Sequence, residues 1–364
     1  MKEYEKKDTI SVVIPVYNEE KYIEKLIESL LKQDYNFELM EFIFVDGNSN
    51  DNTVEIIDKK LGNKSIEYRI LKNEKRLTPI SVNMGIKNAK NDIIVRLDAH
   101  SEYPENYISK CVYYLNKTGA DNVGCLFITR GEGTVGIAIQ NVLETKFGVG
   151  NSAFRTYSES GYTDTVPYGT FRKSLVNKIG YFNEELIRSE DNEFNYRIIK
   201  NGGKVYLFND IGLIYHPRNT IKGICKMAFE NGKWATYTNY IIPGSMKIRH
   251  FIPLIFVLGL LVGTIFSILR FRYLTVLFIL CMLTYLTIDL AYTIYNIKKA
   301  GLSQLLCFVI YPLFHISYGV GSIFGILKII KKVVKKWIKK IKYINIQQKV
   351  LEIYKKRVWK YLNI

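Results

Sequence analysis

Cysteine is scarce and scattered in this 364-residue chain. Its five cysteines lie at positions 111, 125, 225, 281 and 307, with no CxxC pair and no regular spacing. This pattern does not indicate a disulfide framework, so we expect free thiols in a reducing compartment. Residues 1–10 also lack the apolar core of a signal peptide. We therefore expect residues 1–246 to stay on the cytoplasmic side of the cell membrane.

Acidic residues are nearly absent from the last third of the chain. Residues 247–364 hold 19 Lys and Arg but only two acids, whereas residues 1–246 hold 32 residues of each sign. The net charge of +17 therefore belongs to the C-terminal third. This asymmetry argues against a nucleic-acid-binding core. It indicates a basic segment that faces anionic lipid, where each Lys or Arg near the surface contributes about 1 kcal/mol.

The first 110 residues alternate short apolar, β-branched runs with helical periodicity. We predict strands at 10–16, 42–45, 66–71 and 92–97 and helices at 20–32, 51–61 and 79–89, with Asn50 or Asp51 as N-cap of the second helix. Later in the chain we predict strands at 123–128 and 205–208 and a helix at 190–200. The alternation is typical of an α/β fold with a mostly parallel sheet flanked by helices. Ligands of such sheets bind beyond the carboxyl ends of the strands, where Asp46 and Asp98 lie.

Three long apolar runs follow residue 250. Residues 251–269 hold no charge, 273–295 hold only Asp289, and 302–327 contain Pro312. A span needs about 20 apolar residues, so membrane helices are favoured over buried helices of a soluble domain. Because basic residues favour the cytoplasm, we expect an even number of crossings, with Pro312 marking a broken third segment.

The last residues form a basic tail. Residues 328–364 hold 13 basic residues and one acidic residue, with apolar and basic pairs at helical spacing. We expect an interfacial amphipathic helix, with a solvated tail as the alternative. The chain would then divide into a catalytic α/β domain (1–220), interfacial linker helices (221–250), a membrane region of two to three hydrophobic segments (251–327) and this tail.

Carboxylates gather where a nucleotide and a metal would bind. Asp46 ends an apolar strand and could accept a hydrogen bond from a base or ribose, or could simply cap the next helix. Asp98 and His100, one residue apart at a strand end, point to the same side. Carboxylate and imidazole both suit Mn²⁺, whereas Mg²⁺ prefers oxygen, and such an ion would offset charge on a departing diphosphate. A surface pair without metal is the alternative.

A second acidic group opens a predicted helix. Glu190, Asp191 and Glu193 follow Ser189, a plausible N-cap. A helix N-terminus stabilises anions, and one carboxylate in a cleft could remove the proton of an acceptor hydroxyl. An ordinary acidic first turn is the alternative.

Taken in order, these segments carry a resemblance. SVVIPVYNEE, VDGNSNDNT, LDAH and SEDNEFNYRI resemble the motifs of family 2 glycosyltransferases of the GT-A fold, over about residues 9–235. Within that family the chain is similar to succinoglycan-type exopolysaccharide glucosyltransferases, through Tyr103-Pro104 after RLDAH and through His216-Pro217-Arg218.

The resemblance implies roles for single positions. Asp191 would be the catalytic base, with Glu190 beside it. Residues that would bind the nucleotide sugar are Pro15, Tyr17, Glu19, Asp46, Arg76, Asn83 and Asp98. Candidate ligands of a divalent metal, Mn²⁺ or Mg²⁺, are Asp98, His100 and His216. The acceptor-side loop would be Tyr168-Gly169-Thr170.

Two departures from the family pattern stand out. His100 occupies the second acidic position of the usual DxD, which affects the identity and geometry of the metal. The QxxRW motif of processive synthases is absent, so Arg197, His216 or Arg218 could supply diphosphate contacts instead.

The resemblance and the apolar runs together predict a membrane-attached inverting glycosyltransferase. It would move a glucose-type hexose from a UDP-sugar to a lipid-linked, polyprenyl diphosphate oligosaccharide in bacterial exopolysaccharide or cell-surface glycan synthesis. The catalytic domain would lie on the cytoplasmic side of the cytoplasmic membrane and bind no nucleic acid. Alternatives are a polyprenyl-phosphate glycosyltransferase and a non-catalytic GT-A scaffold. A nucleotidyltransferase is disfavoured because Pro15–Glu19 is not a glycine-rich basic loop.

Overall fold

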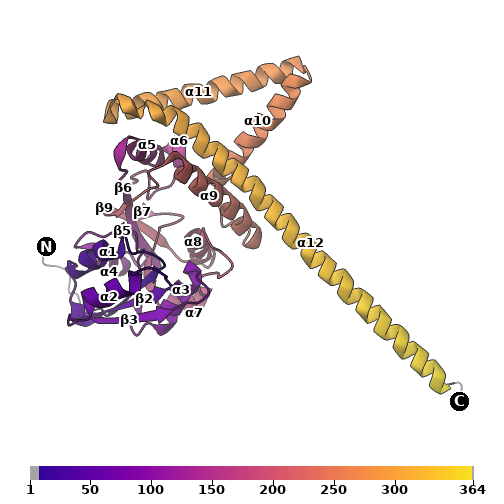
Figure 1. Ribbon diagram of the computed structural model, residues 1–364, viewed down its shortest axis with the longest axis horizontal. Helices are drawn as coiled ribbons and strands as arrows, with labels where there is room; N and C mark the ends of the chain where they lie inside the picture. Colours follow the sequence, from indigo (N-terminus) through magenta and orange to yellow (C-terminus); the bar gives the residue numbers. More distant parts are fainter. Residues whose placement is uncertain (1–7, 363–364) are drawn as a thin grey trace.

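The computed structural model describes residues 8–362. Residues 1–7, which belong to the segment without a signal-peptide core, and residues 363–364 of the basic tail lie outside this range. Figure 1 shows an α/β domain followed by long helices, the last of which extends far beyond the rest of the chain.

A mixed nine-stranded sheet forms the centre of the α/β domain. In spatial order its strands are β3 (Glu67–Lys72), β2 (Met40–Asp46), β1 (Ile10–Val16), β4 (Ile93–Arg96), β8 (Thr170–Arg172), β6 (Asn122–Thr129), β9 (Val205–Tyr215) and β5 (Ser101–Glu102), with β7 (Gly161–Tyr162) paired to β9. The first four strands are parallel, as the alternating sequence predicts. Strand β8 runs antiparallel to both β4 and β6, while β6 and β9 are parallel.

Helices cover both faces of this sheet. One face carries α1 (Ile23–Leu31), α2 (Thr53–Leu61) and α4 (Tyr107–Thr118), and the other carries α3 (Thr78–Asn88), α7 (Ser174–Ile179) and α8 (Glu190–Lys200). The 3-10 helix η1 (Phe37–Leu39) precedes β2, whereas α5 (Gly133–Leu143) and α6 (Lys146–Val149) pack against helices of the C-terminal third. Successive residues of β1 enter different hydrophobic cores, Val12 and Ile14 on one side and Val13 on the other. Since side chains of a strand alternate between faces, this pattern explains why β1 is apolar throughout.

Two predicted helix caps differ in detail from the structure. Helix α2 begins at Thr53 with Asn52 in the N-cap position, and the Asp51 carboxylate accepts hydrogen bonds from the Thr53 N–H at 3.1 Å and from its hydroxyl at 2.5 Å. Ser189 does precede α8, but its φ is +65° and its side chain makes no capping hydrogen bond. In that left-handed conformation Ser189 starts the helix through its backbone turn alone.

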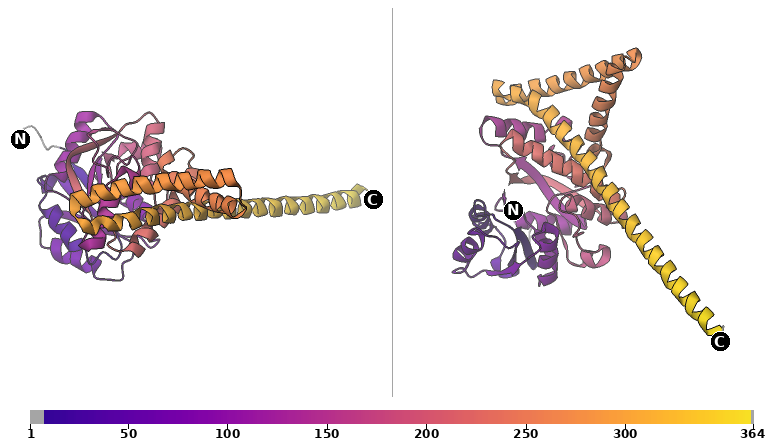
Figure 2. Two further views of the ribbon diagram at one scale, coloured as in Figure 1. Left: turned by 90° about the horizontal axis from the view of Figure 1, so that it is seen from above. Right: turned by 45° about the vertical axis from the view of Figure 1, so that its right-hand side comes forward.

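The C-terminal third is helical. Its elements are α9 (Ile221–Ile241), the 3-10 helix η2 (Ile248–His250), α10 (Ile252–Ile268), α11 (Arg272–Ala300), the 3-10 helix η3 (Leu302–Leu306) and α12 (Cys307–Leu362). Two helical segments, Arg272–Ala300 and Leu302–Ile341, are long and apolar enough to cross a membrane, whereas α10 has 17 residues. Figure 2 shows α10 and α11 leaving the α/β domain and returning to α12.

Glycines allow α12 to pack closely on α9. A Cβ atom on Gly232 of α9 would lie 2.0 Å from the carbonyl oxygen of Tyr318, and one on Gly321 of α12 would lie 2.0 Å from that of Phe229. Such small residues let two helix backbones approach each other directly. The apolar part of α12 is therefore anchored on a helix that follows the α/β domain.

The prediction that Pro312 breaks the third apolar segment is wrong. Helix α12 continues through Pro312 to Leu362, so the apolar segment and the basic tail belong to one helix. Proline removes one backbone donor near the start of this helix. In apolar surroundings the remaining backbone groups are satisfied by continuing the helix, which explains why the proline is tolerated.

Candidate functional site

The carboxyl ends of three parallel strands form one edge of the site. Strand β1 lies between β2 and β4, so Asp46 at the end of β2 and Asp98 just after β4 flank the turn that follows Val16. Gly47 N–H donates to the Val16 carbonyl at 2.8 Å, which joins the first two of these ends. The sheet thus gathers residues that are distant in sequence, as the strand pattern predicts.

Asp46 shapes the loop at this edge. Its carboxylate accepts hydrogen bonds from the Ser49 N–H at 3.0 Å and from the Ser49 hydroxyl at 2.6 Å, and the residue is 6% exposed. Tyr17 is 42% exposed, and the Arg76 guanidinium lies 5.6 Å from its ring centre. Pro15 lies on β1 opposite Val45. An exposed ring with a cation beside it is suited to a nucleotide base and its phosphates.

Asp98 and His100 lie together on the other side of β1. The Nδ1 atom of His100 is 2.7 Å from Asp98 Oδ1 and 3.6 Å from Glu19 Oε1. Burial favours the neutral forms of both groups. Nevertheless the His100 imidazolium, together with Arg96, holds the pKa of Asp98 below its usual range, and Asp98 and Glu19 raise the pKa of His100 to about 11. A metal bound here would have to displace the His100 proton.

The donor set at this pair fits a metal only in part. Among residues 8–362, no three His, Cys, Asp or Glu side chains converge to hold an ion by themselves. His216 is paired elsewhere, with its Nε2 atom 2.8 Å from Glu102 Oε1. Oxygen and nitrogen ligands from Asp98 and His100 suit Mn²⁺, and diphosphate oxygens commonly complete such sites. The protein therefore offers an incomplete set that a bound nucleotide diphosphate would have to complete.

A buried arginine organises the acidic start of α8. Arg96, at the end of β4, contacts Asp191, and its Nη2 atom is 3.0 Å from Glu190 Oε1. Burial raises the pKa of Asp191 to about 6, Arg96 opposes this rise, and the negative charge of Glu190 adds to it. Asp191 is thus a carboxylate with the basicity that a general base needs near neutral pH. The sequence pattern included Arg96 but gave no signal of this role.

The predicted acceptor-side loop supports the same arginine. Arg96 N–H donates to the Gly169 carbonyl at 3.1 Å, and the Tyr168 ring centre is 5.8 Å from the guanidinium. Gly169 has φ +44°, and a Cβ atom there would lie 2.4 Å from Asn122 Oδ1, so only glycine fits. Thr170 is buried in β8, whereas Tyr168 lines the cavity described below.

Two predicted polar residues hold the segment that leads into α8. The Asn83 amide accepts from the Phe182 N–H and donates to its carbonyl, both at 2.9 Å, and the residue is 2% exposed. Arg197 pairs with Glu193 and donates to the Tyr181 carbonyl at 2.9 Å. These side chains fix the segment that leads into α8, and the hydrogen bonds described here already occupy their polar groups.

A cavity of 620 Å³ connects this site to the C-terminal helices. At one end it is lined by His100, Glu190 and Asp191. At the other end it is lined by aromatic side chains of α10, α11 and α12, namely Phe256, Tyr285, Phe314 and Tyr318. The cavity therefore brings the acidic end of α8 and the apolar helices to one continuous space.

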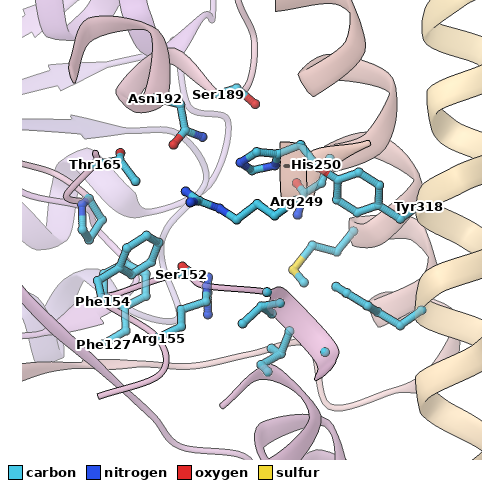
Figure 3. Close-up of a pocket in the computed structure, with 18 of the residues that line it drawn as sticks. Phe127, Ser152, Phe154, Arg155, Thr165, Ser189, Asn192, Arg249, His250 and Tyr318 are labelled. Carbon is cyan, nitrogen blue, oxygen red and sulfur yellow. Dashed lines mark hydrogen bonds between the residues drawn. The ribbon is translucent and has the colours of Figure 1, made fainter. Parts of the chain in front are cut away.

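Two arginines that no motif identified extend into this cavity (Figure 3). The Arg155 guanidinium is surrounded by the rings of Phe127, Phe154 and Tyr215, at 5.1, 5.4 and 4.8 Å from their centres. Arg249 lies just before α10, and its Nη2 atom is 2.8 Å from Asp164 Oδ2. Their only sequence signal is weak: Arg249 is a basic residue next to an apolar run.

Comparisons with known proteins agree with this architecture. Residues 11–180 match the family described as Glycosyl transferase family 2. The dolichyl N-acetyl-alpha-D-glucosaminyl phosphate 3-beta-D-2,3-diacetamido-2,3-dideoxy-beta-D-glucuronosyltransferase of Methanococcus voltae is 29% identical over 277 residues, which cover 74% of this chain and 85% of that protein. The succinoglycan biosynthesis protein ExoA of Rhizobium meliloti is 30% identical over 209 residues, which cover 57% of this chain and 63% of that protein.

The fold comparison adds a solved structure. The mannosyltransferase PcManGT of Pyrobaculum calidifontis, in complex with GDP-Man and Mn²⁺, matches with a TM-score of 0.60 at 16% sequence identity and covers 87% of each chain. At that identity the likeness concerns the fold alone. The range matched by the family includes both strand-end aspartates, Asp46 and Asp98. Residues 11–180 therefore carry the sequence pattern of glycosyl transferase family 2, and the chain as a whole has a GT-A-like fold.

Proposed function

We propose that this protein is a membrane-attached inverting glycosyltransferase that moves a glucose-type hexose from a UDP-sugar to a lipid-linked oligosaccharide. The observation that carries the proposal is the cavity that runs from Asp191 to the aromatic side chains of α10–α12. A water-soluble acceptor would not need an apolar end to its binding site, whereas an acceptor with a long hydrocarbon chain would need one to bury that chain.

The proposed reaction is one in-line displacement. The acceptor hydroxyl oxygen attacks the anomeric carbon of the sugar, the bond from that carbon to the diphosphate oxygen breaks, and the hydroxyl proton passes to Asp191. Arg96 holds Asp191 in place and balances the negative charges of Asp191 and Glu190 before the transfer. No covalent intermediate with the protein is needed, and the configuration at the anomeric carbon inverts.

Charge on the departing nucleotide diphosphate needs stabilisation. A divalent ion, Mn²⁺ or Mg²⁺, would supply Lewis-acid chemistry at the diphosphate when bound. Asp98 and His100 would hold it, Glu19 lies beside them, and Tyr17 and Arg76 would bind the nucleotide from the β1–β2 side. The incomplete ligand set of the protein supports a site that forms only with the donor present.

The relatives support a lipid-linked acceptor and a role in surface glycan synthesis. The Methanococcus voltae protein is named for a dolichyl-linked sugar phosphate, and the Rhizobium protein for succinoglycan biosynthesis. We place the catalytic domain on the cytoplasmic side of the cytoplasmic membrane. The basic residues of α12 favour that side.

A polyprenyl-phosphate glycosyltransferase is the second candidate, because the cavity has a cationic lining. Lys146, Arg155, Arg188 and Arg249 line it, against the two carboxylates of Glu190 and Asp191. In that reaction a lipid phosphate oxygen, which carries no proton at neutral pH, would attack the sugar directly. Asp191 would then not be needed as a base.

The test uses the purified full chain with UDP-, GDP- and dTDP-sugars, with and without Mn²⁺. Each donor is offered with undecaprenyl phosphate or with an undecaprenyl diphosphate-linked sugar. We expect Mn²⁺-dependent transfer from one UDP-sugar to the lipid-linked sugar. Transfer to undecaprenyl phosphate alone would establish the second candidate, and a folded protein that binds no donor would leave a non-catalytic scaffold.

A further inference from the structure

We propose that Arg155 and Arg249 bind the phosphate group next to the isoprenoid chain of the acceptor, with that chain lying against α10–α12. This inference rests on the proposed function and adds the position of the lipid head group within the cavity. It assigns two residues that lie outside the motifs of the nucleotide site.

Arg155 has a charge without a partner. Its Nη1 atom is buried and makes no hydrogen bond within the part of the chain that the structure describes. No acid among residues 8–362 forms an ion pair with it either, and its guanidinium lies beside the three rings of Phe127, Phe154 and Tyr215. Arg155 as a whole is half-buried, but a buried N–H group without a hydrogen bond is costly, so an anion in the cavity that accepts from Nη1 would relieve this cost. Arginine suits phosphate because its planar fork donates two parallel hydrogen bonds.

Arg249 reaches the same space from the membrane side. Its ion pair with Asp164 fixes one end of the guanidinium. The backbone at Arg249 leads directly into α10. In Figure 3, Arg249 extends into the middle of the cavity, while Arg155 lies beside Phe127 and Phe154 at its edge. The two cations thus line one cavity from different elements, Arg155 from the loop after α6 and Arg249 from η2.

The charge balance of the cavity favours an anion. Of its lining residues, four are Lys or Arg and two are acids, and those two acids are already paired with Arg96 behind them. Burial lowers the pKa of His250 to about 4, with help from the neighbouring Arg249, so this lining histidine is neutral. The positive charge therefore comes from side chains that stay charged at any physiological pH.

The far end of the cavity favours a hydrocarbon chain on that anion. Phe256 of α10 stacks on Tyr285 of α11 with ring centres 4.5 Å apart, and Phe314 of α12 completes this wall. Of these helices, α11 and the apolar part of α12 are long and apolar enough to cross a membrane, and α10 is a shorter apolar helix. An inorganic phosphate or a nucleotide would leave this aromatic wall unused, whereas an isoprenoid phosphate would cover it. We therefore commit to an isoprenoid phosphate or diphosphate as the occupant.

The test measures binding of three anions to the full chain in detergent, by calorimetry against protein-free micelles. The probes are inorganic diphosphate, isopentenyl diphosphate and farnesyl diphosphate, which share the diphosphate and differ in the hydrocarbon. We expect farnesyl diphosphate to bind most tightly. Arg155→Ala should weaken it by about 10- to 100-fold, as expected for loss of a hydrogen bond to a charged group. Arg130→Ala removes an exposed cation outside the cavity and should have no effect.

Each other outcome overturns the inference. Equal affinity for the three probes would show that no lipid chain is recognised. Unchanged farnesyl diphosphate binding in both Arg155→Ala and Arg249→Gln would remove the arginines from the site. Loss of UDP-sugar binding in Arg155→Ala, in a variant with unchanged unfolding temperature, would assign the arginine to the donor instead.

Failure of the inference and failure of the proposed function can be told apart. Arginine-dependent farnesyl diphosphate binding by a protein that transfers no sugar would leave this site standing and overturn the proposed function. Sugar transfer to a lipid-linked acceptor that is unaffected by Arg155→Ala and Arg249→Gln would support the proposed function and overturn the phosphate site.

Discussion

Arg96 contacts Asp191 across 95 residues of sequence, from the end of a central strand to the first turn of α8. The same guanidinium also binds Glu190, so both acids that could act as a base share one buried cation. Asp191 is the one that lies closer to this cation and has a raised pKa. The arginine therefore gives the acidic turn a fixed geometry before any ligand binds.

Replacing Asp191 with asparagine should abolish sugar transfer while leaving the fold and donor binding intact. The amide keeps the size of the side chain but cannot accept the hydroxyl proton. General-base catalysis typically contributes about 100- to 10,000-fold, and we expect a loss of that size in kcat. The measurement is transfer to the lipid-linked acceptor, with UDP-sugar affinity measured on the same preparation.

Glu190→Gln is the matched comparison, because Glu190 shares the helix turn and the arginine partner. We expect it to retain much more activity than Asp191→Asn. If Asp191→Asn turns over at near-normal rates, Asp191 is not the base, and the polyprenyl-phosphate reaction becomes the better account.

Activity should fall as the pH drops below about 6. Burial raises the pKa of Asp191 to about 6, and the base is inactive once protonated, so kcat/KM should follow the deprotonated fraction. Glu190→Gln removes a negative charge that raises this pKa, and the acidic limb of the profile should move to lower pH. A limb that stays in place in this variant would contradict the assignment of the limb to Asp191.

Removal of divalent metal with EDTA should stop transfer, and Mn²⁺ should restore it. In His100→Ala we expect the Mn²⁺ concentration for half-maximal rate to rise about tenfold or more, because one candidate ligand is lost. An unchanged metal profile would rule out a ligand role for His100. His216→Ala decides the remaining candidate: since His216 is paired with Glu102, we expect no shift, and a shift equal to that of His100→Ala would make it a ligand.

Packing of α12 on α9 should be sensitive to one methyl group. In Gly321→Ala the new Cβ would lie 2.0 Å from the Phe229 carbonyl oxygen, so the helices must separate. Overpacking of this kind costs about 1–3 kcal/mol, which should lower the unfolding temperature in detergent. The control is Gly259→Ala in α10, where the added Cβ meets nothing within 4 Å and no loss is expected. Equal unfolding temperatures for the two variants would contradict the packing of α12 on α9.

Local patterns were sufficient for the first four strands and the three helices between them. Strand β1 was predicted with its observed bounds, and the helix at 190–200 likewise, because apolar runs and helical spacing are written in consecutive residues. Strands β5, β7 and β8 were not predicted. Each has two or three residues and exists only because a neighbouring strand pairs with it. The prediction of a break at Pro312 was wrong because it considered the proline alone, whereas the apolar surroundings of the helix favour its continuation.

The candidate site also contains residues that local sequence patterns located and residues that they did not. Asp46 and Asp98 could be located from sequence, since a strand end is a local signal. The partnership of Arg96 with Asp191 and the cage around Arg155 could not, because both depend on contacts between elements far apart in the chain. For Asn83 the family resemblance implied a contact to the nucleotide or diphosphate, which stays a prediction; the structure adds that its amide is hydrogen-bonded to the Phe182 backbone.

Because α12 is continuous, its packing on α9 also fixes the position of Lys332, which lies further along the same helix. Lys332 of α12 contacts Glu185, in the segment that leads to Asp191, and its Nζ atom is 3.0 Å from the Tyr237 hydroxyl. Because no break separates Gly321 from Lys332, one inserted residue between them would turn Lys332 by about 100° and move it about 1.5 Å along the axis. Seven inserted residues would restore the angle but not the height. The packing of α12 on α9 thus sets both the direction and the height of the Lys332 contact with Glu185, in the segment that leads to Asp191.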